Sequence, residues 1–322
     1  MDFTEMRALA NRIKENVGKV IVGKEDVVDL LLVAVISSGH VLLEDVPGTG
    51  KTLLAKAMAK SLGCSFKRVQ FTPDLLPTDL SGIYFYNQKN GEFEFRAGPI
   101  FSQIVLADEI NRATPRTQSS LLECMEERQI TVDGITQRLE RPFLVLATQN
   151  PVENQGTFPL PEAQLDRFLI KIGMGYPSSG ESVAILKRFK GGNPLDTITA
   201  VASADDIIAA QNLYSETRVD DDLLRYIVEL VEKTRSHHEV AMGVSPRGSQ
   251  SLLKAAQVYA VLQGRDYVIP DDIKAMAVPV LAHRLVPKGN LRYKERWSEQ
   301  VIEKLLNDIP VPTEAQLAQR QE

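Results

Sequence analysis

The chain has 322 residues, of which 43% are hydrophobic and 25% are charged, a composition typical of a globular protein with room for two domains. Its formal net charge of −5 argues against a surface that holds nucleic acid by bulk electrostatics, so no constitutive nucleic-acid partner is expected. The sequence lacks a basic signal region and any apolar run near twenty residues, so it predicts no membrane span and a cytoplasmic location. Cys64 and Cys124 lack metal-ligand spacing and are expected to be buried free thiols.

The first motif follows an N-terminal helical stretch and lies between an apolar strand at 41–44 and a helix. Gly48 and Gly50 would let backbone N–H groups curl around phosphate oxygens, and the N-terminal end of the following helix favours negative charge. Lys51 would reach the β- and γ-phosphates, and the Thr52 hydroxyl would ligate Mg²⁺. A plain strand-to-helix turn would explain the glycines but leaves Lys51 without a role. The segment therefore predicts binding of ATP or GTP.

The next elements are a strand near 66–71, a hairpin around Asn90-Gly91 and a buried strand near 102–107 that leads into two acidic residues. Asp108 is suited to holding the Mg²⁺ that Thr52 also contacts, and Glu109 can polarise an attacking water. The alternative is a solvated acidic turn. The alternation of strands and helices after the phosphate loop favours a hydrolytic site.

A second hairpin, around Asp133-Gly134, precedes a strand near 143–148 that is followed by Asn150. In an open parallel sheet the C-terminal strand ends line the ligand crevice, so the Asn150 amide can bridge the attacking water and the γ-phosphate. Since Asn-Pro is also a turn signal, a plain turn stays an alternative. Arg167 stands directly before the apolar strand 168–172, which is expected to form a sheet edge.

The pattern becomes helical after Gly173–Pro177, and the glycine and proline there indicate a boundary. We therefore expect an α/β domain at 1–176 and an all-helical domain at 177–322, with a loosely ordered tail after Pro312. Helices are predicted from residue 203, across 223–231, from 245 to 262, and from 270.

The helix at 245–262 has Ser245 as its expected N-cap, Pro246 at its first position and Arg247 in its first turn. A cation in a first turn opposes the helix dipole by tenths of a kcal/mol to about 1 kcal/mol. Arg247 is therefore expected to face an anion. The alternative is an exposed arginine that pairs with a nearby acid.

In their order and spacing, these motifs resemble Walker A, Walker B, sensor 1, the arginine finger and sensor 2 of an AAA+ ATPase, and more narrowly the MoxR family. The residues that carry the resemblance are Gly48–Thr52, Asp108–Glu109, Asn150, Leu165–Phe168 and Ser245–Arg247. Asp45 stands where the usual loop has its first glycine, but MoxR-like loops often lack that glycine. The resemblance implies nucleotide-binding residues Val22, Gly23, Pro47, Gly48, Thr49, Gly50, Lys51, Thr52 and Leu53, metal ligands Thr52 and Asp108, and catalytic residues Glu109, Asn150, Arg167 and Arg247.

The resemblance also implies a fold: a P-loop AAA+ parallel-sheet core with a helix-2 insert and a pre-sensor-1 hairpin, followed by an all-helical lid domain. The two predicted hairpins correspond to these inserts, which in related proteins approach a central pore. The aromatic residues of the first hairpin could instead simply pack across its strands; they are Tyr84, Tyr86, Phe93 and Phe95.

The implied function is ATP hydrolysis with Mg²⁺ by a ring, a hexamer by resemblance, in which Arg167 reaches the γ-phosphate of a neighbouring subunit. Arg247 would report the nucleotide state to the lid. The MoxR resemblance further implies chaperone-like remodelling of a protein client, in maturation or in cofactor or metal insertion, with a von Willebrand factor A domain partner. The alternatives are a magnesium-chelatase-like motor subunit and a nucleotide-gated scaffold with little turnover.

Overall fold

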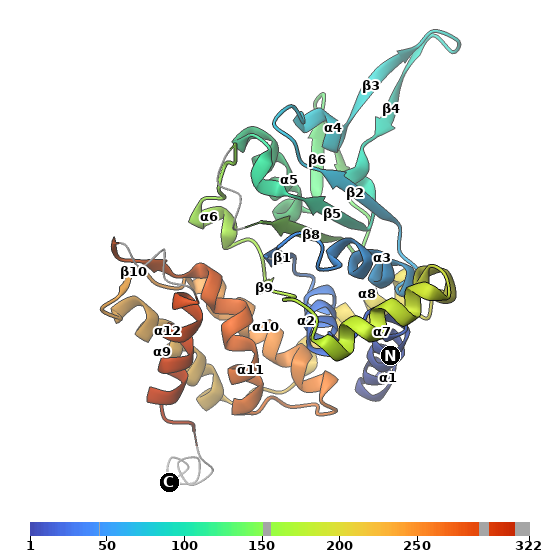
Figure 1. Ribbon diagram of the computed structural model, residues 1–322. Helices are drawn as coiled ribbons and strands as arrows, with labels where there is room; N and C mark the ends of the chain where they lie inside the picture. The colour runs from blue at the N-terminus through green and yellow to red at the C-terminus, as the bar shows by residue number, and fades with distance from the viewer. Residues whose placement is uncertain (45, 151–155, 290–295, 313–322) are drawn as a thin grey trace.

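The computed structural model describes residues 1–44, 46–150, 156–289 and 296–312. Asp45, the proline of the Asn-Pro turn and the tail after Pro312 lie outside these residues. Figure 1 shows an α/β part that carries two projecting hairpins and, beside it, a mainly helical part.

The α/β part is built on a five-stranded sheet of order β2-β5-β8-β1-β9, in which every neighbouring pair is parallel (Figure 1). All five predicted strands are confirmed. The edge strand begins two residues later than expected, because the turn after helix α6 continues to Phe168, whose N–H donates to the Leu165 carbonyl. The strands are β1 (Val41–Glu44), β2 (Phe66–Gln70), β5 (Ile104–Asp108), β8 (Leu144–Gln149) and β9 (Ile170–Ile172).

Both faces of the sheet are covered, which explains why its central strands are apolar throughout. Side chains alternate between the faces, so Leu43 and Leu42 enter different hydrophobic clusters. The cluster of Leu43 includes α1 (Phe3–Gly18), α2 (Glu25–Ile36) and α3 (Lys51–Ser61). The cluster of Leu42 includes α5 (Pro115–Glu127). The shorter α helices of this part are α4 (Pro77–Ser81) and α6 (Glu162–Leu165).

The helical part contains every predicted helix. Ser203 caps α8 through a reciprocal capping box with Asp206, and Ser245 caps α10 with Pro246 at the first position. The helices are α7 (Ser179–Lys190), α8 (Ala204–Leu213), α9 (Asp221–Ser236), α10 (Pro246–Leu262), α11 (Pro270–Leu281) and α12 (Trp297–Asp308). Among the described residues of both parts there are also five short 3-10 helices: η1 (Pro99–Phe101), η2 (Ile110–Arg112), η3 (Pro194–Thr197), η4 (Tyr214–Glu216) and η5 (Ala282–Arg284).

The helical part also contains one short pair of strands that the sequence did not predict. Strands β10 (Val240–Met242) and β11 (Val286–Pro287) pair antiparallel and join the end of α9 to the segment after η5. The two strands are short and lack a long alternating pattern, which is why periodicity did not reveal them.

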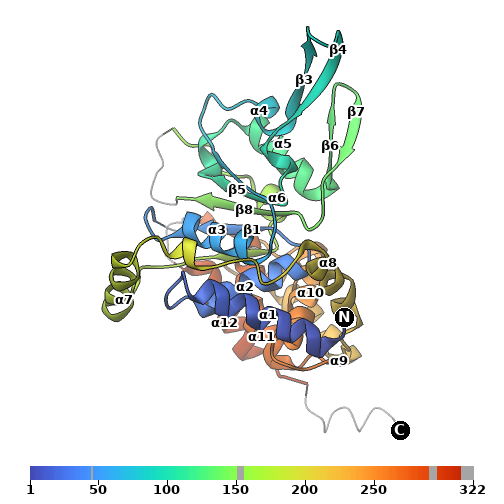
Figure 2. The same ribbon diagram turned by 90° about the vertical axis from the view of Figure 1, so that its right-hand side faces the viewer.

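The two parts share a hydrophobic cluster. Residues of α1, α2 and the sheet join residues of α8, α9, α10 and α11 in one set of buried contacts. Figure 2 shows α1 and α2 between the sheet and helices α9, α11 and α12 of the helical part. The division near residue 176 stays a prediction. The shared cluster nevertheless means that the N-terminal helices hold both parts together.

Both hairpins project from the same end of the α/β part (Figures 1 and 2). In the hairpin of β6 (Gln129–Val132) and β7 (Ile135–Arg138), Asp133 and Gly134 both have positive φ, as a type I′ turn requires. The hairpin of β3 (Gly82–Asn87) and β4 (Glu92–Ala97) differs from expectation. Its register pairs Asn87 with Glu92, so the loop has four residues and only its last, Gly91, has positive φ.

The aromatic residues of the first hairpin pack across its strands. The rings of Tyr84 and Phe95 lie 5.0 Å apart and those of Tyr86 and Phe93 lie 5.4 Å apart. Tyr86 and Phe93 are nevertheless exposed. Elsewhere, none of the helices in the described ranges has the length and hydrophobicity needed to span a bilayer.

Candidate functional site

A cavity of about 930 Å³ opens at the C-terminal ends of β1, β5 and β8. It collects the phosphate loop, the acidic pair and the amide at the end of β8, which are far apart in the sequence. Its apolar side is lined by Val20, Ile21, Val22, Met174, Pro177, Ile185 and Phe189, and its polar side by Lys51, Thr52, Arg68, Gln70, Asp108, Glu109, Arg112, Thr148, Gln149 and Asn150.

The phosphate loop has the conformation that its glycines permit. Gly48 and Gly50 have φ of +86° and +91°, and a methyl group at either position would meet nothing within 4 Å. Their backbone therefore faces open space. Gly50 is the N-cap of α3, and both it and the first residues of α3 line the cavity, where the positive end of the helix dipole favours an anion. Lys51 Nζ donates to the Val46 carbonyl at 2.9 Å.

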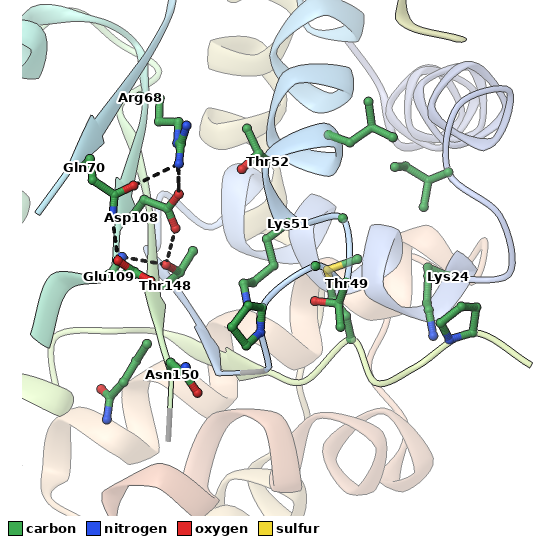
Figure 3. Close-up of a pocket in the computed structure, with 18 of the residues that line it drawn as sticks. Lys24, Thr49, Lys51, Thr52, Arg68, Gln70, Asp108, Glu109, Thr148 and Asn150 are labelled. Atoms are coloured by element: carbon green, nitrogen blue, oxygen red, sulfur yellow. Dashed lines mark hydrogen bonds and ion pairs between the residues drawn. The ribbon is translucent and has the colours of Figure 1, made fainter. Parts of the chain in front are cut away.

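Asp108 is held in place by two side chains from neighbouring strands (Figure 3). Its Oδ1 accepts a hydrogen bond from Thr148 Oγ1 at 2.6 Å, and its Oδ2 lies 2.7 Å from an Arg68 guanidinium nitrogen. The Arg68 side chain is 47% exposed while that of Asp108 is 13% exposed, so the arginine can move into water more easily than the carboxylate. Figure 3 also shows Thr52 on the side of α3 that faces Asp108.

Glu109 has an unusual backbone, with φ of +56° in the left-handed region that non-glycine residues rarely adopt. Its N–H donates to Thr148 Oγ1 at 2.8 Å. Its Oε2 accepts a hydrogen bond from Gln70 Nε2 at 2.6 Å (Figure 3). The same oxygen pairs with Arg112 Nε at 3.1 Å. The strained backbone and the two partners together aim the carboxylate along the edge of the cavity.

The donor set fits Mg²⁺ with a nucleoside triphosphate. A hydroxyl and a carboxylate are the hard oxygen ligands that Mg²⁺ prefers, and it normally takes its other ligands from phosphate and water. No cluster of three or more His, Cys, Asp or Glu side chains suited to a metal occurs among the described residues, so a protein-only metal cage is absent from them. The buried Gln149 Oε1 accepts no hydrogen bond within the described part of the chain and is suited to a water molecule.

The segment before α2 lies beside the apolar side of the cavity, but not every predicted residue lines it. Val22 does, whereas Gly23 lines a neighbouring cavity instead. Gly23 has φ of +64°, and a Cβ atom there would stand 1.6 Å from Glu181 Oε1 on α7. Gly23 therefore allows the chain to turn beneath α7. The other eight predicted nucleotide-binding residues all line the first cavity.

Arg167 and Arg247 do not line this cavity. Arg167 precedes β9, which runs parallel to β1 with Val41 opposite Ile170. It therefore lies at the N-terminal ends of the parallel strands, whereas Asp108 and Asn150 lie at the C-terminal ends. At roughly 3.3 Å per residue, a strand of four or five residues separates these two ends by about 15 Å.

The two arginines lie together at a second cavity, of about 270 Å³. Arg167 donates to the Leu122 carbonyl at 2.7 Å, and Arg247 pairs with Glu126 at 2.7 Å. Arg247 thus has the acidic partner that was the alternative expectation. Because both side chains of that pair are about 40% exposed, it contributes little stability and a stronger anion can replace it. The charged side chains of this cavity are Glu126, Arg128, Asp166, Arg167, Arg247, Lys254 and Arg284.

Sequence reasoning missed the residues that hold the two carboxylates. Arg68 and Gln70 both lie in β2, two residues apart, and therefore point to the same side of the strand. Polar residues at alternate positions of a predicted strand were a usable signal. Their partners, however, depend on β2 pairing with β5, with Gln70 opposite Asp108.

Comparisons with known proteins agree with this geometry. Residues 40–170 match the "ATPase family associated with various cellular activities (AAA)", and residues 232–305 match the "AAA lid domain". The chain is 51% identical to the uncharacterized protein YeaC of Bacillus subtilis over 310 residues, covering 96% of this chain and 97% of that one. It is 42% identical to the chaperone MoxR1 of Mycobacterium tuberculosis over 317 residues, covering 96% and 83%. The crystal structure of a candidate ATPase from Cytophaga hutchinsonii superposes with a TM-score of 0.90 at 39% identity, covering 97% of each chain.

Proposed function

The chain belongs to the MoxR family of AAA+ ATPases, and on that basis we propose that it hydrolyses ATP with Mg²⁺ to remodel a protein client. The observation that carries the proposal is the meeting of three elements in one cavity: an open phosphate loop, the Thr52 hydroxyl and the carboxylates Asp108 and Glu109. A protein that only bound nucleotide would need the loop but not a second carboxylate.

Each residue has a separate task in this proposal. Lys51 and the backbone N–H groups of Gly48–Thr52 would hold the phosphates, while Thr52 and Asp108 would hold Mg²⁺. When bound, Mg²⁺ supplies neutralisation of the phosphate charge. Asn150, which is 8% exposed at the end of β8, would orient the attacking water.

Glu109 would take a proton from that water as general base. Gln70 and Arg112 both contact its Oε2. Since both partners withdraw electron density from the base, the proposal includes a rearrangement of at least one of them before hydrolysis.

Arg167 and Arg247 would act on the nucleotide of a neighbouring subunit. Arg167 precedes the N-terminal end of β9 and lines the second cavity, whereas its own phosphate loop lies at the C-terminal ends of the strands and lines the first cavity. A ring of identical subunits, a hexamer in this proposal, brings one subunit's second cavity to the next subunit's first cavity. A guanidinium supplied in this way stabilises charge on the transferring phosphoryl group and is worth about 10³–10⁵ in rate.

The client and partner follow from family membership rather than from a surface of this chain. The name chaperone MoxR1 supports a chaperone-like task. We propose a von Willebrand factor A domain protein as partner and maturation, or cofactor or metal insertion, as the outcome. The projecting hairpins, with exposed Tyr86 and Phe93, are the proposed client-facing elements.

The deciding experiment mixes two inactive variants. Lys51→Ala removes the phosphate contact, and Arg167→Ala removes the shared arginine, so each alone should hydrolyse ATP poorly. In a mixed ring, an Arg167→Ala subunit keeps an intact phosphate loop and can receive Arg167 from a Lys51→Ala neighbour. Phosphate release should therefore recover on mixing, and the activity of the parent protein should rise with concentration as rings assemble.

The control is Arg225→Ala, which removes an arginine that is 65% exposed on α9 and should leave hydrolysis unchanged. No recovery, with mixed assembly shown independently by mass photometry, would refute the shared site. Nucleotide binding without phosphate release by the parent protein would favour the scaffold alternative. Stimulation of hydrolysis by a porphyrin with Mg²⁺ would favour the chelatase-like motor.

A further inference from the structure

Two contacts tie the segment that carries Arg167 to the helical part of the chain. Asp166, directly before Arg167, accepts hydrogen bonds from Arg284 Nε at 2.7 Å through Oδ1 and from Ser245 Oγ at 3.0 Å through Oδ2. Ser245 is the N-cap of α10 and lies two residues before Arg247. One carboxylate therefore joins the two elements that present Arg167 and Arg247.

Arg284 is the centre of this junction. It is only 7% exposed and lies in η5, between α11 and β11. Its guanidinium also donates to the carbonyls of Phe168 at 2.8 Å and Leu169 at 3.3 Å, and to Ser251 Oγ on α10 at 3.3 Å. The planar fork of five donors suits such a set of acceptors, and a lysine ammonium could not reach them all. The residues on both sides of Arg167 are thus fixed by one buried side chain.

The sequence of α10 leaves room for this side chain. A Cβ atom at Gly248, in the first turn of α10, would stand 2.2 Å from Val244 Cγ1 and 3.2 Å from Arg284 Cδ. Glycine inside a helix is unfavourable relative to alanine. Its presence here is explained first by the Val244 side chain and second by the close approach of Arg284 to the helix end that carries Arg247.

Electrostatics alone would separate these groups. Arg167, Arg247 and Arg284 all line the second cavity, and like charges at short range repel one another. Asp166 and Glu126 supply the compensating negative charge. Holding the half-buried Arg167 and the exposed Arg247 near each other requires a rigid frame behind them, and the buried Arg284 provides it.

We propose that Arg284, acting through Asp166, is a positioning residue that sets Arg167 and Arg247 at a fixed separation, so that both meet the anion of a neighbouring subunit together. This inference rests on the proposed function, in which the site is completed between subunits. It assigns the helical part a task besides carrying Arg247, since η5 and α10 would also align Arg167 of the α/β part.

The test uses a charge-neutral double variant. Asp166→Asn alone would leave Arg284 as a buried charge without its carboxylate, which is strongly destabilising. Asp166→Asn with Arg284→Met removes both charges and should fold, because buried pairs replaced by apolar groups are often tolerated. ATP binding should stay unchanged, whereas hydrolysis should fall about 10²-fold, the cost of a misplacement near 1 Å.

Mixed rings separate a positioning effect from general damage. Subunits with the double variant keep an intact phosphate loop, so Lys51→Ala subunits should restore their activity by supplying a well-placed Arg167. The same double variant combined with Lys51→Ala should fail to restore Arg167→Ala subunits, although Lys51→Ala alone restores them. Restoration of activity should therefore depend on which of the two subunits carries the double variant.

The matched control is Asp272→Asn with Arg265→Met, which removes another ion pair of the helical part, at 2.6 Å and with Asp272 fully buried. This control, combined with Lys51→Ala, should still restore Arg167→Ala subunits. If the reference mixture of Lys51→Ala and Arg167→Ala fails, the shared site is wrong. If the reference succeeds and the triple variant restores activity equally well, the positioning role is refuted.

A second variant covers the case in which the double variant does not fold. Ser245→Gly keeps a tolerated N-cap residue but removes one of the two contacts to Asp166. Combined with Lys51→Ala, it should restore Arg167→Ala subunits less well than Lys51→Ala alone does. Equal restoration would contradict the inference.

Discussion

Replacing Glu109 by glutamine tests the proposed base with the smallest change of shape. The backbone of Glu109 is held by its N–H bond to Thr148 Oγ1, which the substitution does not touch. A glutamine oxygen at the Oε2 position can still accept hydrogen bonds from both Gln70 and Arg112. What disappears is the negative charge that accepts a proton from water.

The magnitudes of the two consequences differ widely. The Glu109 side chain is 26% exposed and Arg112 is 39% exposed, so their pair contributes at most about 1 kcal/mol and folding should change little. Loss of a positioned base should slow hydrolysis by about 10²–10⁴, which corresponds to about 2.7–5.4 kcal/mol in the barrier. A large loss of rate at nearly constant stability is therefore expected.

Three measurements check this expectation. Phosphate release should fall as stated, binding of a fluorescent ATP analogue should persist, and the melting temperature should stay close to that of the parent protein. Lys51→Ala, in contrast, should abolish binding. The control is Glu232→Gln, an exposed carboxylate on α9. Hydrolysis by Glu109→Gln at the parent rate, or loss of its ATP binding, would refute the assignment of the base.

Three further outcomes are expected. Arg68→Ala removes a cation that competes for Asp108, so Mn²⁺ binding with ADP, followed by electron paramagnetic resonance, should tighten by up to about fivefold; weaker binding would contradict this. Burial raises the pKa of Cys64 to about 11 and, with the charge of a neighbouring glutamate, that of Cys124 to about 12. Folded protein should therefore resist iodoacetamide at pH 8 while urea-unfolded protein reacts, and rapid labelling of the folded form would contradict the burial. Burial also lowers the pKa of His40 well below its usual value, so below about pH 6.5 the unfolded chain binds a proton that the folded chain refuses. The free energy of unfolding, from urea titrations, should therefore fall as pH drops, by up to about 1.4 kcal/mol per unit, and His40→Gln should flatten that slope. If the His40→Gln variant kept the slope of the parent protein, the pH dependence would not come from His40.

Short-range features could be predicted from the sequence because consecutive residues encode them. The turn at Gly48 and Gly50, the caps at Ser203 and Ser245 and the type I′ turn at Asp133-Gly134 each depend on a few adjacent residues and their allowed backbone angles. The strands could be predicted because their apolar residues either alternate with polar ones or form a continuous run. The prediction of a type I′ turn at Asn90-Gly91 was wrong, because the register of β3 against β4 gives a longer loop, and that register depends on the pairing of the whole strands.

The sequence by itself therefore determined the fold class, the phosphate loop and the acidic strand end. Only the tertiary structure decided what those residues contact. Gln70 meets Glu109 because β2 pairs with β5, Gly23 is needed because α7 crosses above it, and Arg284 reaches Asp166 across more than a hundred residues. The physical reason is that local backbone preferences act over a few residues. Strand order and helix packing, which bring distant polar groups within 3 Å, minimise the exposed apolar surface of the whole chain at once.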